Sequence, residues 1–343
     1  MIEAVLRGAR HMGAQLAALS PRQSGGGCGI HFDAHSLHFV RLMRVPGGDG
    51  LRLDASGATV LDDGILQGAR IAKPEAAARS LSGLLERIGI SAADLGGDTV
   101  VAALPAHGLR TQIVDCPADL PPRALRAWCE RRAALLLPGD GDLALRNRVG
   151  VTWAEPGGHR LRLYACEADL VDDRAAVLEM AGLPVHAVDA AHEAGRRAFR
   201  WVQSDSVGAV APVALLQIDA SDLDLAVFEG RLCIADARER FDGVGGHPEA
   251  LASVVRELVG GFPAAPDAIY VAANGASPAG LVAISDALAA ACAVPVRHFD
   301  PLQRFEAPAS TTARRHGFVP QASLAVPCGL ALRAMEMRGM SCG

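Results

Sequence analysis

Carboxylate and hydroxyl side chains recur in two short hairpin-like segments that lie far apart in the chain. The first is Gly29-Ile30-His31-Phe32-Asp33-Ala34-His35-Ser36-Leu37-His38, which also carries imidazoles, and the second is Gln217-Ile218-Asp219-Ala220-Ser221-Asp222-Leu223-Asp224. Apolar stretches typical of strands flank both turns. Carboxylates can hold a divalent cation, and hydroxyl and backbone N–H groups in a turn can donate to phosphate. The two turns are therefore the candidate ligand-binding segments.

The histidines and cysteines predict no metal centre. On a strand, His31 and His35 fall on one face while His38 falls on the other, so we expect structural or exposed histidines. None of the eight cysteines forms a Cys-x-x-Cys pair, which favours buried thiols in a reducing compartment over a zinc site or a disulfide framework. No Gly-x-Ser-x-Gly motif indicates a nucleophilic serine. The sequence thus predicts no catalytic residue.

Composition favours a folded protein of two domains, or of one large split unit. The chain has 343 residues, of which 50% are hydrophobic and 21% are charged, enough to build substantial cores. Its net charge of −5 gives no electrostatic case for binding nucleic acid. No apolar run approaches the roughly 18 residues of a membrane-spanning helix, so no span is expected.

Strand and helix patterns alternate along the chain, which predicts an α/β protein. Both halves begin with a hairpin, and this layout indicates an internal pseudo-repeat. We expect an amphipathic helix and a flexible glycine-rich hinge over 1–27. A first domain is predicted over 28–205, with a βαββ block inserted at about 110–166. The second domain is predicted over 206–343, with a C-terminal helix that returns to the first.

Several motifs occur in an order that resembles a known family. The paired hairpins are similar to the phosphate-binding hairpins of actin-like ATPases. The other motifs are Asp115-Cys116-Pro117-Ala118-Asp119-Leu120, Ala181-Gly182-Leu183-Pro184, Val188-Asp189-Ala190, Ile269 to Gly275, Val296 to Pro301 and Gly329-Leu330-Ala331-Leu332-Arg333. Together they resemble the PilM family of type IV pilus assembly proteins, which is related to FtsA. The resemblance implies an α/β, actin-like ATPase (ribonuclease H-like) fold. It has two related domains flanking a cleft and an FtsA-like inserted βαββ subdomain.

Both hairpins depart from the pattern of that fold at the same two positions. The resemblance implies a first-position Asp that organises magnesium, where this chain has His31 and Gln217. It also implies a third-position Gly that lets backbone approach phosphate, where this chain has Asp33 and Asp219. Two like charges about 4 Å apart repel by roughly 1 to 4 kcal/mol, which disfavours a polyphosphate. The prediction is a degenerate nucleotide cleft formed by Asp33, Ser36, Gln217, Asp219, Ser221, Asn274 and Gly275.

A contrary interpretation retains ATP as a cofactor. The alternative ligands for a divalent cation that would bridge phosphates are Asp33, Asp219, Asp222 and Asp224. The protein would then be an ATP-binding conformational switch in pilus assembly, or a weak ATPase, with a non-standard Mg and phosphate site. An actin-fold sugar or acetate kinase also needs the first-position carboxylates, so His31 and Gln217 disfavour it.

The departures in both hairpins, taken with the resemblance, predict a scaffold and not an enzyme, with no cofactor and no bound metal. The expected place is the cytoplasm, peripheral to the inner membrane, in the type IV pilus assembly platform. The expected partner is the N-terminal tail of a PilN-like bitopic membrane protein, held beside the inserted subdomain. Pilus motor ATPases and the platform protein are further expected partners. A type II secretion L-type protein is disfavoured because no membrane helix follows.

Overall fold

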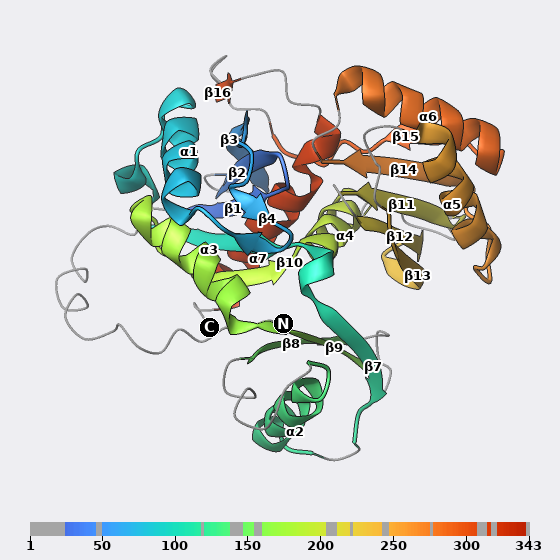
Figure 1. Ribbon diagram of the computed structural model, residues 1–343, viewed down its shortest axis with the longest axis horizontal. Helices are drawn as coiled ribbons and strands as arrows, with labels where there is room; N and C mark the ends of the chain where they lie inside the picture. The colour runs from blue at the N-terminus through green and yellow to red at the C-terminus, as the bar shows by residue number, and fades with distance from the viewer. Residues whose placement is uncertain are drawn as a thin grey trace.

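The computed structural model describes residues 25–45, 50–117, 120–137, 147–153, 160–203, 211–219, 222–241, 247–274, 277–306, 314–316 and 321–340. The amphipathic helix expected at the N-terminus lies outside these residues, as do Ser221 and Gly275. Two sheets, each covered by helices, form the body of the molecule, and a third, smaller sheet lies below them (Figure 1).

The first sheet has the strand order β10-β6-β1-β2-β3-β16. Its strands are β1 (Gly27–Phe32), β2 (Ser36–Arg44), β3 (Leu51–Val60), β6 (Thr99–Leu104), β10 (Ala187–Ala190) and β16 (Arg314–His316). The β1–β2 pair forms the first predicted hairpin, with His31 opposite His38. A short ribbon, β4 (Leu66–Gln67) and β5 (Arg70–Ile71), leads into helix α1 (Pro74–Arg87).

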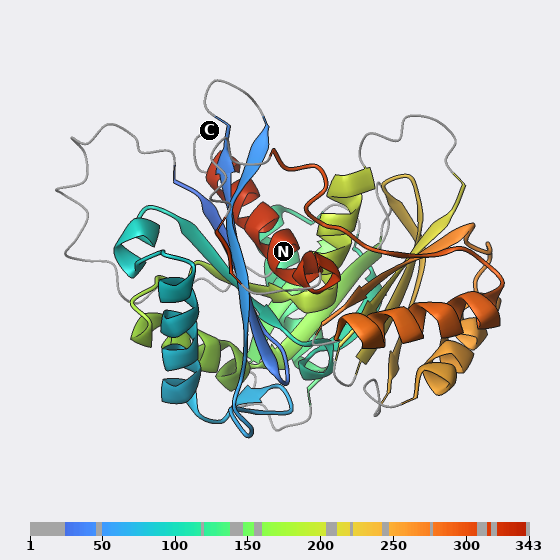
Figure 2. The ribbon, with the colours of Figure 1, turned by 90° about the horizontal axis from the view of Figure 1, so that it is seen from above.

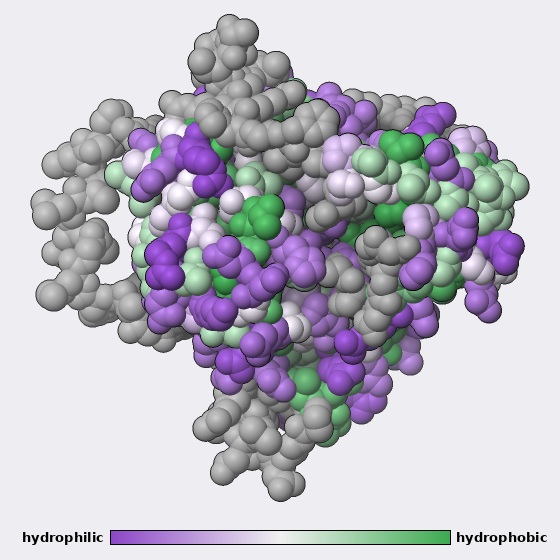
Figure 3. Space-filling view, turned by 45° about the horizontal axis from the view of Figure 1, so that its top comes forward, coloured by the Kyte–Doolittle hydropathy of each residue, from purple (hydrophilic) through white to green (hydrophobic). Residues whose placement is uncertain are grey.

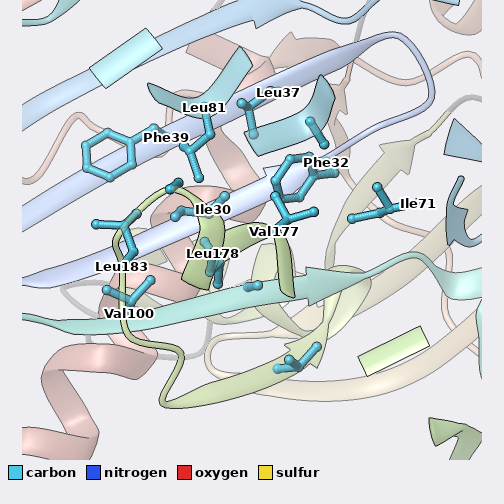
Figure 4. Packing of buried hydrophobic residues seen from close by; sticks show 14 of the residues in the cluster. Ile30, Phe32, Leu37, Phe39, Ile71, Leu81, Val100, Val177, Leu178 and Leu183 are labelled. Carbon is cyan, nitrogen blue, oxygen red and sulfur yellow. The ribbon is translucent and has the colours of Figure 1, made fainter. Parts of the chain in front are cut away.

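Alternate residues of this sheet face different helices. Ile30, Phe32 and Val100 pack in one cluster with α1 and α3 (Ala168–Met180), as Figure 4 shows from close by. Val101 and Ala103 pack instead with α4 (Ala191–Val202) and α7 (Ala325–Met340). Strands buried on both faces read as nearly continuous apolar runs, which is why Thr99–Leu104 was recognisable as a strand.

Taken from β15 to β13, the strands of the second sheet correspond in order to β10-β6-β1-β2-β3 of the first. The second sheet runs β13-β12-β11-β14-β15, with β11 (Val213–Ile218) and β12 (Asp222–Glu229) as the second predicted hairpin. The remaining strands are β13 (Leu232–Arg240), β14 (Ala268–Ala273) and β15 (Val296–His298). Helices α5 (Pro248–Gly260) and α6 (Pro278–Cys292) cover its outer face. In both sheets the hairpin lies beside a parallel strand, β6 or β14, so the predicted pseudo-repeat is present.

Helices α4 and α7 form a layer between the two sheets (Figure 2). Phe199 of α4 packs with Leu42 of the first sheet and Phe228 of the second. The two helices approach closely at Gly329, where an added Cβ would lie 1.7 Å from the carbonyl oxygen of Ala194. A residue with a side chain there would force the helices apart, so α4 and α7 depend on that glycine.

The inserted segment folds as the predicted βαββ unit. Strands β7 (Arg110–Asp115), β9 (Arg160–Glu167) and β8 (Asn147–Trp153) form an antiparallel sheet in the order β7-β9-β8. Helix α2 (Pro122–Ala134) packs on one face around Val114, Cys129, Leu161 and Leu163. The unit lies below the two large sheets in Figure 1 and is connected to them through β7 and β9.

The glycine run at 25–27 is packed, which differs from the flexible hinge that we predicted. Gly26 donates its N–H to Asp98 at 2.6 Å. An added Cβ at Gly25 would lie 2.2 Å from the carbonyl oxygen of Gly97, and one at Gly27 would lie 2.5 Å from that of Ala331. These glycines therefore allow close backbone contact at the edge of β1. Within the described chain, no helix is long and apolar enough to cross a bilayer.

Candidate functional site

The two hairpin turns meet between the sheets, and their third-position carboxyl groups are in contact. Asp33 is only 4% exposed, and its Oδ1 accepts the N–H of Ala34 at 2.7 Å. Its side chain is also hydrogen-bonded to the side chain of Asp219 in the second turn. Ionised carboxylates only accept hydrogen bonds, so this pair must hold a proton. Asp33 and Asp219, both predicted for the nucleotide cleft, thus contact each other.

Hydrogen bonds favour the ionised form of Asp33. Burial alone would raise the pKa of Asp33, but hydrogen bonds from Asp219 and from the Ala34 N–H hold it below its ordinary value. The hydrogen bond between Asp33 and Asp219 joins the β1–β2 turn to the β11–β12 turn.

The first-position residue of the first turn is a neutral, buried histidine. His31 is fully buried, and neither ring nitrogen has a hydrogen-bond partner among the residues described. Burial lowers the pKa of His31 to about 3, so the ring is uncharged at neutral pH. It stacks on His38 with ring centroids 6.1 Å apart. The His38 Nε2 lies 2.8 Å from the hydroxyl of Ser36, so this predicted phosphate donor already has a partner.

The first-position residue of the second turn is tied to helix α4. The Gln217 Nε2 donates to the carbonyl of His192 at 2.9 Å and to Asp224 at 3.1 Å. The space for the Gln217 amide exists because residue 195 is glycine: an added Cβ there would lie 1.7 Å from its Oε1. The hydrogen bonds of Gln217 therefore connect β11 to α4.

A buried ion network continues from Asp224 into the inserted subdomain. Arg196 donates to both oxygens of Asp224, at 2.6 and 3.0 Å, and to Asp236 at 3.1 Å. Arg162 of β9 forms two further bonds of 2.7 Å to Asp236. Burial opposes ionisation of Asp236, but Arg162 and Arg196 outweigh it and lower its pKa to about 2. The network thus joins β9, α4, β12 and β13.

A parallel contact links Tyr164 and Glu193. The Tyr164 hydroxyl donates to Glu193 at 2.7 Å, and Glu193 also lies 3.4 Å from Arg196. Burial would raise the pKa of Glu193, yet Arg196 and the tyrosine hydroxyl lower it to about 2. The carboxylate is therefore ionised, with protein partners on both sides.

The remaining predicted site residues also contact protein groups. Asp222 accepts both the backbone N–H and Nδ1 of His107, at 3.2 and 2.7 Å, which again joins the two sheets. Asn274 follows β14, and its N–H donates to the carbonyl of Ile218 beside the second turn. Ser221 and Gly275 lie outside the described residues. Among the residues that the structure places, no group of His, Cys, Asp and Glu is arranged to hold a metal ion.

Residues 29–247 match the family model for type IV pilus assembly protein PilM. The chain belongs to the PilM family. Among solved structures, a PilM–PilN type IV pilus biogenesis complex is similar with a TM-score of 0.70 at 17% identity, over 92% of this chain and 99% of that chain. No curated protein sequence matches the chain.

Two further solved structures are similar at lower TM-scores. The ethanolamine utilization protein EutJ of Carboxydothermus hydrogenoformans is similar with a TM-score of 0.48 at 12% identity, over 91% of each chain. A Bacteroides thetaiotaomicron protein of unknown function with an actin-like ATPase fold has a TM-score of 0.46 at 9% identity, over 82% of this chain and 93% of that chain. The predicted family and the predicted actin-like α/β fold are both confirmed.

Sequence reasoning missed the residues that fill the cleft of this PilM-family protein. Arg162, Arg196 and Asp236 were not among the predicted site residues, although they connect three parts of the fold. One signal was present in the sequence: Arg160, Arg162 and Tyr164 alternate with apolar residues along β9, which marks a polar face. The partners of that face lie on other strands and helices, so the alternation alone could not identify them.

Proposed function

We propose that this protein is a scaffold of the type IV pilus inner-membrane assembly platform and that it does not hydrolyse ATP. Its place would be the cytoplasm, at the membrane surface, where motor ATPases and the platform protein are further candidate partners. Family membership and the similarity to a PilM–PilN complex support the pilus assignment. The observation that carries the proposal is the direct bond between the Asp33 and Asp219 side chains.

Three features of the cleft disfavour a working ATPase site. Both first-position residues are neutral, and Gln217 is committed to α4 through His192 and Asp224. Phosphate would have to break the Asp33–Asp219 bond and would then face two carboxyl groups. Asp224, a ligand in the alternative Mg site, accepts hydrogen bonds from Nε and Nη2 of Arg196. Each group that the ATP-dependent alternative needs therefore has another partner.

A surface beside the inserted subdomain suits an extended peptide. Strand β7 is an edge of its sheet and pairs with β9 alone among the described strands. Ile113 lies opposite Arg162 in that pairing, so it faces the body of the molecule and not α2, and it is 39% exposed. Hydrophobic side chains surface over this lower part of the molecule in Figure 3. Backbone pairing along an edge strand with one apolar contact is a common mode of peptide recognition.

Calorimetric titration tests both parts of the proposal on the full chain. A synthetic PilN N-terminal tail peptide should bind, and Ile113→Asp should weaken it about tenfold or more because it places a charge at the apolar contact. Val282→Asp is the matched control: Val282 is 49% exposed on α6 of the other sheet, and its replacement should leave binding unchanged.

Titration with Mg·ATP tests the inactive cleft. No binding that depends on Asp224 is expected at millimolar nucleotide. Micromolar binding that is lost in Asp224→Ala would overturn the proposal and support the ATP-binding switch. Failure of the tail peptide to bind a folded sample would overturn the scaffold assignment independently of the nucleotide result.

A further inference from the structure

A pocket of about 580 Å³ opens where the end of β2, the start of β3, the C-terminal turns of α4 and α7, and the β12–β13 turn meet. Figure 2 shows these helix ends and strand ends on one side of the molecule. Arg44, Arg197, Arg200 and Arg231 line it together with Leu332 and Met335. None of the predicted nucleotide-cleft residues lies in its wall.

The lining of this arginine pocket is strongly positive in a chain that is negative overall. Four arginines and one glutamate, Glu336, give a net charge of 4 − 1 = +3, whereas the whole chain carries −5. Glu336 lies 3.7 Å from Arg197 and 3.9 Å from Arg333, so its carboxylate already forms ion pairs with these two arginines. Arg197 is also satisfied by Asp189 at 3.0 Å and by the carbonyl of Gly329.

The other three arginines have no such partners. Among the residues that the structure describes, Arg44, Arg200 and Arg231 make no hydrogen bond or ion pair, although they come from three different elements and converge on one pocket. Arg200 is partly buried, and burial lowers its pKa. Arg44 and Arg231 are exposed, and guanidinium groups that share one pocket repel one another, so an anion bound among them is stabilised. The arrangement therefore indicates a ligand with several negative charges.

The remaining wall of the arginine pocket is apolar and rigid. Leu332 and Met335 of α7 and Leu51 of β3 supply aliphatic contact surface. The ring of Trp201 is fixed by stacking on Phe305, with centroids 6.2 Å apart, and by Arg304, which lies 5.3 Å from its centroid. A ligand that fills this space would combine anionic groups with a compact apolar or aromatic body.

We propose that the arginine pocket binds a nucleotide-sized phosphorylated metabolite through Arg44, Arg200 and Arg231. Planar guanidinium groups bind phosphate in bidentate fashion, and cavities of roughly 300–1,000 Å³ hold small organic ligands. Arg44 belongs to the first sheet and Arg231 to the second, so the bound ligand would bridge the two domains. The volume of the pocket, about 580 Å³, suits a small polyanion better than a helix or strand of an acidic protein.

The test titrates the full chain in EDTA with inorganic pyrophosphate, and with the four ribonucleoside 5′-monophosphates and 5′-triphosphates. At least one should bind at submillimolar concentration, more weakly as salt rises. Arg44→Gln and Arg231→Gln should each weaken binding about tenfold, the loss expected for one charge-assisted hydrogen bond. Arg79→Gln, which removes an exposed arginine on α1, is the matched control and should bind as the wild type does.

A conservative substitution is used to test Arg200, because its side chain is partly buried. Arg200→Lys keeps the charge and removes the planar fork, so it should fold normally and still bind less tightly. Absence of binding by pyrophosphate and all eight nucleotides, or equal affinities in the wild type and the three pocket variants, would overturn the proposal. Binding of poly-glutamate in their place would overturn it in favour of an acidic protein segment. The pocket variants should retain PilN-tail binding, which separates this test from that of the scaffold function.

Discussion

The β1–β2 turn and the β11–β12 turn occupy equivalent places in two sheets of the same strand order, yet their first-position residues are accommodated by opposite means. In the first turn, His31 and His38 are buried and uncharged, with pKa values lowered to about 3 and about 4 by burial. In the second turn, Gln217 belongs to a hydrogen-bonded network around the Arg196–Asp224 ion pair.

This difference shows that a first-position carboxylate can be replaced in two physically distinct ways. The first turn became part of the core of its own domain, so its contribution depends on keeping imidazoles neutral. The second turn became part of the joint between domains, so its contribution depends on keeping opposite charges paired. The two turns should therefore respond to different perturbations, and the variants below separate them.

Removing the central cation of the second turn should have the largest effect. Arg196→Met leaves Asp224 and Asp236 buried without their shared guanidinium, and it should lower the free energy of unfolding by about 3–5 kcal/mol. Urea unfolding followed by circular dichroism measures the loss. Arg126→Gln is the control, because the exposed Arg126–Glu130 pair should contribute less than about 1 kcal/mol. Equal losses in both variants would contradict a structural role for the network.

As the pH falls, the first turn should lose its contribution to the free energy of unfolding before the second turn does. Because the pKa of His31 is about 3 when folded and near 6.5 when unfolded, the unfolded chain binds more protons between these values. Its stabilising contribution is therefore complete above about pH 6.5 and is lost as the pH falls toward 3, by about 3 kcal/mol between pH 7 and 4. His31→Leu should flatten the decline of unfolding free energy over that range.

Asp236 provides the contrasting titration. Its pKa is about 2 when folded and near 3.9 when unfolded, so its contribution is complete above about pH 4 and is lost below that. Asp236→Asn should lower stability without changing the slope between pH 7 and 5. If His31→Leu retained the wild-type slope in that range, the neutral-histidine account of the first turn would be wrong.

Disturbing the hydrogen bonds that connect Gln217 to α4 should lower stability by a smaller amount, and a second substitution should restore part of it. Gly195→Ala places a methyl group 1.7 Å from the present position of the Gln217 Oε1, so the amide must move and its two bonds weaken. A loss of about 1–3 kcal/mol in unfolding free energy is expected. The double variant Gly195→Ala with Gln217→Ala should recover part of this loss, because the alanine pair leaves room. An additive double variant would show that the two residues do not interact.

The sequence predicted the elements of both turns because their signals are local. Apolar runs around short polar turns identified the hairpins, and the helices at α1 and α5 were placed within one residue at each end. The inserted βαββ unit followed from alternation along β7 and β9 and from a helix predicted over 123–137, which the structure has at Pro122–Ala134. Family resemblance then supplied the fold that connects these pieces.

The contacts of the turns could not be predicted, because their partners are distant in sequence. Asp222 resembled an ordinary turn residue, yet it bonds His107, which lies 115 residues away. Arg162 and Asp236 are separated by 74 residues, and nothing local pairs them. The glycines at 25–27 resembled a linker for the same reason, since the groups that they touch, such as Asp98 just before β6, are distant in sequence.

A substitution at the contact between the two turns should change stability least, and it should raise stability where the substitutions above lower it. The Asp33–Asp219 pair needs a bound proton, which becomes harder to keep as the pH rises. Asp219→Asn supplies an amide donor at every pH, so it should leave stability near the wild-type value at pH 5 and raise it by about 1 kcal/mol at pH 8. Thermal unfolding at the two pH values measures the change, and Asp63→Asn at an exposed position should show none. A variant less stable than the wild type at pH 8 would mean that the carboxyl pair is not joined by a shared proton, and that the two turns are held together by the Asp222–His107 contact instead.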